Sequence, residues 1–206
     1  MKIKKRDSLF IIILIMIFTI FISYIMIYFL NENISNAITA TTAIIGAIAI
    51  WYQLKKDHDI AKAEFIFNLN TTFSNDEKIT FIYNKFKEFR DDNSLVFSPE
   101  DGRKMGDYIM YFEIINYLIN DNIINIIMVD KLFTSRFFIM SNNPYVHKYQ
   151  LNSPAFTSPI YELYCRWYNY RIKLGKGIPY AKFALHKAYP QSFERRKNGE
   201  LVYSYK

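Results

Sequence analysis

The first residue whose type and setting could support chemistry is Glu113. It lies in the segment Tyr111-Phe112-Glu113, inside one of the most apolar stretches of the second half of the chain. A carboxylate near a core costs several kcal/mol of free energy unless it is paired, so Glu113 needs a partner such as Arg136, Arg166 or Arg171. The functional interpretation is an acid with a perturbed pKa in a site. The alternatives, which we favour, are a structural ion pair or an acid on the exposed edge of a helix.

Metal-ligand and nucleophile residue types are present, but their spacing does not predict a site. Asp57-His58-Asp59 is followed by Glu64, and helical spacing places these side chains on different faces. His147 and His186 have no acidic or histidine neighbour at useful spacing. Cys165 would need an aligned histidine base to act as a nucleophile, so we expect a buried structural thiol. We predict no catalytic residue, no metal and no cofactor.

Positive charge is concentrated at the C-terminal end. Residues 163–206 hold 10 basic and 2 acidic side chains, whereas residues 57–162 hold 10 basic and 15 acidic ones. Cations interleaved with aromatic residues can contact anionic lipid headgroups or stack on and pair with nucleic acid. The third possibility is that this segment packs on the acidic body of its own domain. The candidate contacts are Arg171, Lys173, Lys176, Lys182, Lys187, Arg195, Arg196 and Lys197.

The N-terminal part predicts a two-helix transmembrane hairpin. Leu9–Leu30 is 22 residues without a charge, about 33 Å as a helix, and Ile34–Leu54 follows after a short turn. Basic residues flank the hairpin at both outer ends, so the positive-inside rule predicts a multi-pass protein of the inner membrane with both termini in the cytoplasm. The expected interface residues are Tyr24, Tyr28, Trp51, Tyr52, Lys55 and Lys56.

One face of the second expected span is made of small residues. Thr39, Ala43, Gly46 and Ala47 recur at helical spacing. Small side chains let helix backbones approach closely. The face could therefore pack against the first span of the same hairpin, support a homo-oligomer, or do both.

Beyond the hairpin, the apolar periodicity is helical nearly throughout. Helix starts are expected at Ser74, as a capping box with Glu77, and at Ser98-Pro99. Further helices are expected over about 124–140 and 160–174. No alternating strand pattern of useful length is present. The sequence predicts an all-α protein with a hairpin over residues 1–55, a cytoplasmic helical bundle over 56–177, and a mostly irregular basic tail over 178–206.

The segments LKKDHDIAKAEFIFNLNTTF and YFEIINYLINDNIINIIMV follow one another around a short capped helix. This pattern resembles a bacterial family of membrane-anchored proteins of unknown function, some of them described as abortive-infection or phage-defence-like. The resemblance covers about residues 40–170 and rests on pattern rather than on a catalytic signature. It implies an α-helical cytoplasmic domain and supplies no activity, cofactor or catalytic residue.

The sequence therefore favours a membrane-anchored, non-enzymatic sensor or effector module, with phage defence as its setting. One alternative is a membrane-tethered hydrolase or nuclease that uses Glu113. The other is a binder of nucleic acid or anionic partners through the basic tail. The expected partners are membrane lipids, a second copy of the chain, and an unidentified cytoplasmic protein or small-molecule ligand, with nucleic acid as the less favoured choice.

Overall fold

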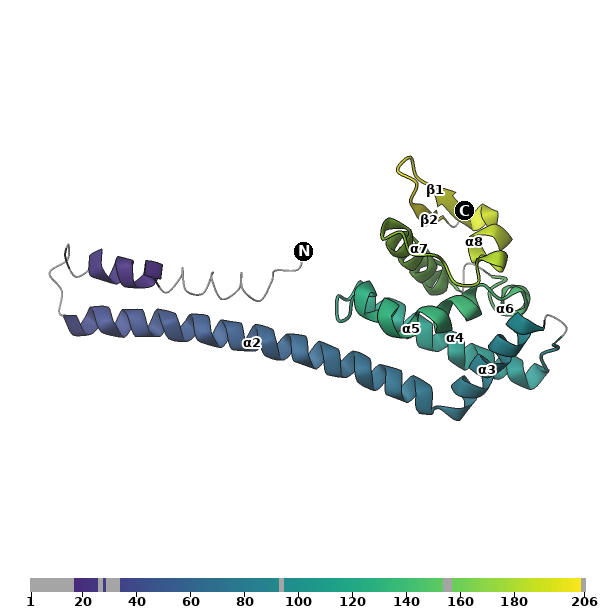
Figure 1. Cartoon of the computed structure of the whole chain (residues 1–206), viewed down its shortest axis with the longest axis horizontal. Coiled ribbons are helices and arrows are strands. Elements are labelled where there is room, and N and C mark those ends of the chain that lie inside the picture. Colours follow the sequence, from purple (N-terminus) through teal and green to yellow (C-terminus); the bar gives the residue numbers. More distant parts are fainter. Residues whose placement is uncertain (1–16, 26–27, 29–33, 93–94, 154–156, 205–206) are drawn as a thin grey trace. The chain divides into compact units, whose positions relative to one another are not determined.

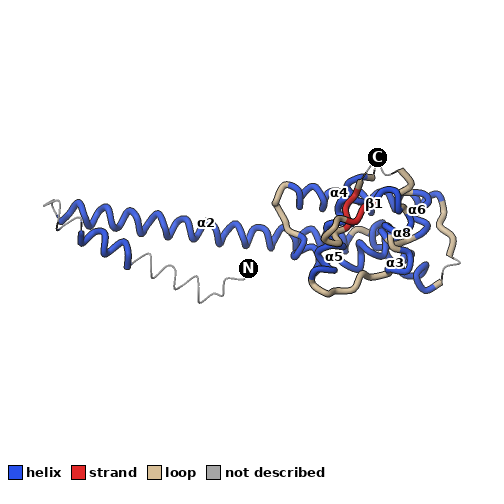
Figure 2. Tube along the Cα trace, turned by 90° about the horizontal axis from the view of Figure 1, so that it is seen from above, coloured by secondary structure: helices blue, strands red, loops and turns tan. Residues whose placement is uncertain are grey.

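The computed structural model describes residues 17–25, 28, 34–92, 95–153 and 157–204. The chain divides into two compact units, residues 1–61 and 62–206. Helices account for most of the described residues, which confirms the all-α class (Figures 1 and 2). The longest, α2 (Ile34–Asn75), begins in the first unit and ends in the second.

In the first unit, described residues 17–25 are helical and lie beside α2. The hydroxyl groups of Ser23 and Thr41 share a hydrogen bond, and Ser23 also bonds to the carbonyl oxygen of Thr19 at 2.9 Å. An added Cβ at Gly46 would meet no other group within 4 Å. The described hairpin contact therefore runs through hydroxyl groups, and no close backbone approach is seen at Gly46.

The membrane prediction is corrected here. No helix among the described residues is both long enough and apolar enough to cross a membrane. This finding contradicts a multi-pass protein of the inner membrane with both termini in the cytoplasm. In the second expected span, residues 34–54, Ala and Thr fill many positions, and they contribute less transfer free energy than Ile or Leu. The first expected span, residues 9–30, lies largely outside the described residues.

The second unit is a bundle in which α4 packs against α3 and α7, and α5 packs against α3 and α7. The expected helices over 124–140 and 160–174 correspond to α5 and α7, whereas α6 was not expected. The helices are α3 (Glu77–Asp91), α4 (Pro99–Asn120), α5 (Ile126–Ser141), α6 (Pro144–Tyr149), α7 (Ser158–Lys173) and α8 (Leu185–Ala188).

One expected helix start is confirmed and one is wrong. Ser98 forms a capping box, because its hydroxyl accepts the amide of Asp101 and the Asp101 carboxylate accepts the amide of Ser98 at 2.7 Å. Ser74 does not cap α3. Since α2 continues to Asn75, the cap falls to Asp76, whose carboxylate accepts two amides of the first turn.

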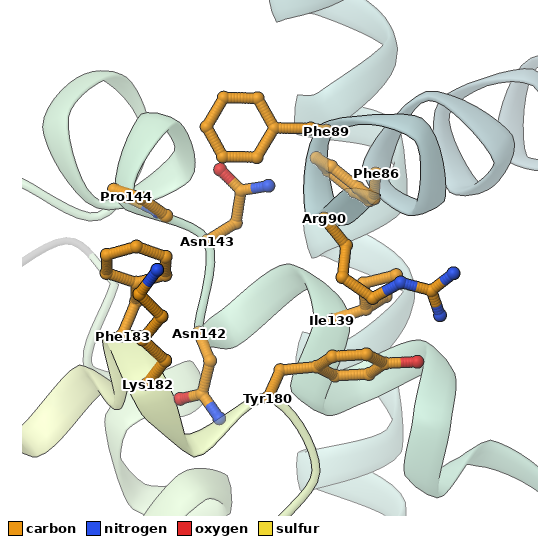
Figure 3. Close-up of a pocket in the computed structure, with 10 residues that line it drawn as sticks. All are labelled: Phe86, Phe89, Arg90, Ile139, Asn142, Asn143, Pro144, Tyr180, Lys182 and Phe183. Carbon is orange, nitrogen blue, oxygen red and sulfur yellow. The ribbon is translucent and has the colours of Figure 1, made fainter. Parts of the chain in front are cut away.

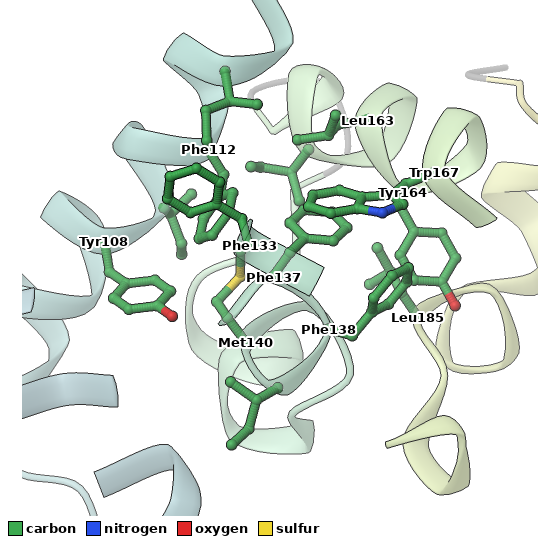
Figure 4. Close-up of a cluster of buried hydrophobic side chains, with 14 of the residues drawn as sticks. Tyr108, Phe112, Phe133, Phe137, Phe138, Met140, Leu163, Tyr164, Trp167 and Leu185 are labelled. Carbon is green, nitrogen blue, oxygen red and sulfur yellow. The ribbon is translucent and has the colours of Figure 1, made fainter. Parts of the chain in front are cut away.

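Aromatic rings fill the centre of the bundle (Figure 4). Phe137 of α5 stacks on Trp167 of α7 with ring centroids 4.8 Å apart. Phe73, near the end of α2, meets Tyr108 and Phe133 edge to face. These rings join helices that are distant in sequence, so the core spans the whole second unit.

The C-terminal segment contains strands that the sequence pattern did not predict. β1 (Phe193–Arg195) pairs with β2 (Leu201–Tyr203) in an antiparallel hairpin. The side chain of Asn169 on α7 bonds to both backbone groups of Leu201, at 2.7 and 2.8 Å. Strands of three residues are too short to show alternation, so packing on α7 decides their conformation.

A buried carboxylate joins this C-terminal segment to the bundle. Asp130 of α5, whose side chain is 3% exposed, accepts from Arg171 and Lys176 at 2.7 Å each and from Trp167 at 2.9 Å. Lys176 is brought there by the end of α7, where Gly175 has a φ of 66° and the amide of Lys176 bonds to the carbonyl of Arg171.

The pKa of Asp130 lies well below its ordinary value. Burial alone would raise this pKa, but hydrogen bonds from Lys176, Trp167, Arg171 and Thr134 outweigh it. The carboxylate is therefore held in its charged form by the groups that it ties together.

We predict that Asp130→Asn destabilises the protein by about 3 kcal/mol, because it leaves Arg171 and Lys176 beside a neutral group. The free energy of unfolding in urea measures this. Asp107→Asn, an exposed control on α4, should change it by less than about 0.5 kcal/mol. Equal stability of the two variants would contradict the assigned role of Asp130.

The same carboxylate predicts a pH dependence. Since the folded pKa is lower than the unfolded one, the stabilisation is complete above the unfolded value of about 3.9 and is lost as the pH falls further. The difference in unfolding free energy between the natural chain and Asp130→Asn should be constant above about pH 5 and shrink below about pH 4. A difference that stays constant to about pH 2 would oppose this assignment.

Candidate functional site: a ring-lined pocket

A pocket of about 100 Å³ opens in the second unit where three segments meet (Figure 3). The end of α3 contributes Phe86, Phe89 and Arg90. The end of α5 and the link to α6 contribute Ile139 and Asn142–Pro144. The C-terminal segment contributes Tyr180, Lys182 and Phe183. The C-terminal segment, which supplies the last of these groups, is held on the bundle by the ion pair of Lys176 with Asp130. The pocket therefore depends on that ion pair.

Most of the wall is apolar. Phe86 and Ile139 are buried at the base of the pocket, and Phe89 and Phe183 are more exposed. An aromatic wall of this kind favours a flat, apolar ligand group, since offset and edge-to-face ring contacts add to the burial of apolar area.

Asn142 and Asn143, in the link between α5 and α6, differ in which of their amide atoms have hydrogen-bond partners. Asn142 uses both ends: its nitrogen donates to the carbonyl of Pro179 at 2.9 Å, and its oxygen accepts the amide of Leu185 at 3.0 Å. Asn143 uses its oxygen to cap α6, by accepting the amides of Tyr145 and Val146. This cap fixes the orientation of the Asn143 amide.

The nitrogen of Asn143 is a hydrogen-bond donor that stays accessible at the pocket. Asn143 is 3% exposed, and no hydrogen-bond partner of its Nδ2 atom is seen within the described ranges. Figure 3 shows this nitrogen on the side facing Phe86 and Arg90. Because this nitrogen is accessible and has no protein partner, an acceptor group of a ligand could take the hydrogen bond.

Cations flank the pocket from opposite sides (Figure 3). Arg90 lies over the Tyr180 ring and bonds to the carboxylate of Asp91 at 2.5 and 2.6 Å. Hydrogen bonds to Asp91 and Tyr180 raise the pKa of Arg90 further above its ordinary value. Lys182 lies over the Phe183 ring, and among the described residues no carboxylate pairs with it.

Tyr180 holds a strained backbone at the pocket wall. Its φ is 57°, in the left-handed region that a bulky residue rarely adopts. Such conformations cost on the order of 1 kcal/mol and cluster at binding and active sites. Here the neighbouring bond from Asn142 to Pro179 holds the segment in place.

Glu113 lies away from these groups. It is partly buried on α4, burial raises its pKa, and no ion pair of Glu113 is seen in the described part of the chain. Of the arginines expected to pair with it, Arg136 bonds to Asn70 and Ser74, Arg166 bonds to Asn120, and Arg171 bonds to Asp130. Asp130 and Asp101 are buried and ion-paired among the described residues, whereas Glu113 is only partly buried.

The remaining chemical candidates are dispersed. His147 is buried and bonded to the carbonyl of Ser141 at 2.8 Å, and His186 bonds to Tyr164. Burial lowers the pKa of both histidines, and it raises the pKa of Cys165 to about 12. Within the residues that the structure describes, no group of three or more His, Cys, Asp or Glu could hold a metal ion.

The candidate basic contacts have separate roles. Arg171 and Lys176 bind Asp130, and Lys182 lines the pocket. Arg195 lies over Tyr168, and Arg196 is 3.9 Å from Glu200. The side chains of Lys173, Lys187 and Lys197 are exposed.

In the first unit, the expected interface residues are exposed, and Lys55 lies over the Trp51 ring at 5.5 Å. They are Tyr24, Tyr28, Trp51, Tyr52, Lys55 and Lys56. On the small-residue face, Thr39, Ala43 and Ala47 are also exposed, and Gly46 is partly buried.

Sequence reasoning missed the pocket. Neither Asn142-Asn143-Pro144 nor the pair Phe86 and Phe89 was singled out from the sequence as a candidate site. A usable signal was present in the paired asparagines before a proline, because one side chain must cap the next helix and the other is free for tertiary contacts.

Comparison of the chain with protein-family models, curated proteins and solved structures finds no match. The resemblance to abortive-infection proteins therefore stays a prediction from the sequence pattern.

Proposed function

We propose that the second unit is a non-enzymatic ligand-binding module whose site is the ring-lined pocket. The observation that carries this proposal is the mostly apolar, ring-lined cavity, at which the Nδ2 atom of Asn143 is accessible and has no protein partner within the described ranges. Small-molecule binding sites are typically concave and mostly apolar, with a small number of polar groups that point into the site.

The enzyme alternative has less support from the geometry. A hydrolase or nuclease built on Glu113 needs a histidine or arginine beside that carboxylate. His147 is instead engaged by the Ser141 carbonyl, and Arg171 by Asp130. The pocket itself offers hydrogen-bond donors and rings, with no aligned nucleophile and base among its lining residues.

The tail-binding alternative is also weaker than the pocket. Arg171 and Lys176 are committed to Asp130, so they have little charge to offer an anionic partner. Lys173, Lys187 and Lys197 are exposed, as are Arg195 and Arg196. Scattered exposed cations would give weak, salt-dependent binding.

A ligand in the pocket would couple segments distant in sequence. It would contact α3, the link between α5 and α6, and the C-terminal segment at once. A ligand that binds only when these segments are docked stabilises the docked state by mass action. The module would thus act as a sensor, and the effector role in phage defence predicted from the sequence would be its output.

We predict that single-ring compounds bind the full chain and that Phe89→Trp weakens them about tenfold, because the larger ring occupies the pocket. Ligand-observed NMR with a library of single-ring fragments measures this. The matched control is Phe81→Trp, the same change at an exposed position of α3 outside the pocket. It should bind like the natural chain.

The urea midpoint of each variant checks folding. If the natural chain, Phe81→Trp and Phe89→Trp bind the same compounds equally, the pocket is not the binding site. If the natural chain binds no fragment at all, the proposed function is wrong.

A further inference from the structure

The side-chain groups that the pocket can offer to a ligand are donors. Asn143 offers an N–H and Lys182 an ammonium group, and Arg90 adds a guanidinium group that is paired with Asp91. The side-chain acceptors are already used, since the oxygen of Asn142 accepts from Leu185 and the oxygen of Asn143 caps α6. A complementary ligand group must therefore accept hydrogen bonds without needing to donate them.

The charged residues that line the pocket are both cations. Lys182 and Arg90 flank the opening, and Arg90 is paired with Asp91, whose side chain is 64% exposed. A solvent-exposed ion pair of this kind contributes little, so an incoming anion can compete with Asp91 for the guanidinium group. The pocket therefore favours a negatively charged acceptor.

The size of the cavity limits what the anion is attached to. The volume is about 100 Å³, which is smaller than the apolar cavity of about 150 Å³ that holds one benzene molecule. A nucleotide or a lipid chain exceeds this space, and a single ring is enclosed only in part, with its anionic group at the opening. The rings of Phe86, Phe89 and Phe183 would contact a flat aromatic face better than a saturated ring.

We infer that the pocket binds a small aromatic carboxylate, one six-membered ring bearing a carboxylate group. This inference rests on the proposed function and names its ligand class. The ring lies against the aromatic wall, and the carboxylate accepts from Asn143 in the positive field of Lys182 and Arg90.

Four probes separate the contributions of ring and charge in titrations of the full chain. They are benzoate, benzamide, cyclohexanecarboxylate and acetate. Benzoate should bind most tightly. Benzamide, which is flat but neutral, should bind about tenfold more weakly, as expected for loss of a charge-assisted hydrogen bond. Cyclohexanecarboxylate should bind more weakly than benzoate because it lacks the aromatic face, and acetate should show no measurable binding.

Asn143→Asp is the decisive variant. An aspartate keeps the oxygen that caps α6, so the fold is retained, but it replaces the N–H donor with a negative charge. It should abolish benzoate binding and leave benzamide, which carries its own N–H groups, bound as tightly as before or more tightly. A variant that binds benzoate like the natural chain would overturn the inference.

Lys182→Gln tests the charge separately. Lys182→Gln should weaken the binding of benzoate about tenfold and leave the affinity for benzamide unchanged. Lys187→Gln, an exposed lysine outside the pocket, is its control and should change neither. Equal effects of the two lysine variants would contradict a specific role for Lys182.

The outcomes distinguish this inference from the proposed function. If benzoate and benzamide bind equally and Phe89→Trp weakens both, the pocket binds ligands but the carboxylate assignment is wrong. If neither binds while other single-ring fragments do so in a Phe89-dependent way, only the ligand class is wrong. If no fragment binding depends on Phe89, both proposals fail.

Discussion

Asp130 is the interaction on which the second unit depends. A carboxylate that is 3% exposed must be fully hydrogen-bonded, because burying it unpaired would cost several kcal/mol. Its donors come from Arg171 and Trp167 on α7 and from Lys176 just beyond α7. The hydrogen bonds of the Asp130 carboxylate therefore specify which faces of α5 and α7 are in contact, and they fix the path of the chain just after α7.

The pocket follows from this arrangement. Beyond Lys176 the chain is held again by Asn142, which bonds to Pro179 and to Leu185 on either side of the left-handed Tyr180. Two attachments close together leave the intervening residues little freedom to collapse onto the bundle. Tyr180 and Phe183 of this short segment and Phe86 and Phe89 of α3 line the same pocket, and Arg90 of α3 lies over the Tyr180 ring.

The contacts of Asp130 also bear on how the charge pattern of the chain is interpreted. An acidic body and a basic C-terminal end suggest an external anionic partner, yet part of that asymmetry is neutralised inside the domain, where Arg171 and Lys176 share Asp130. Lys182 instead contributes its charge to the pocket. Two of the eight candidate cations are thus committed inside the domain, and the pocket is the place where a cation lies beside an apolar cavity.

The sequence by itself determined the all-α class and most helix positions of the second unit, because apolar periodicity and capping residues such as Ser98 act within a few neighbouring residues. It did not determine the hydrogen bonds and ion pairs of Asp130 or the pocket beside Asn143. Both need groups more than thirty residues apart in the sequence to meet. Glu113 was a candidate buried acid because it lies in an apolar stretch, and helix packing leaves it only partly buried. Only the tertiary structure decided that Arg171 and Lys176 pair with Asp130, and that the amide nitrogen of Asn143 has no protein partner within the described residues. Local sequence patterns carry no information on pairing between distant segments.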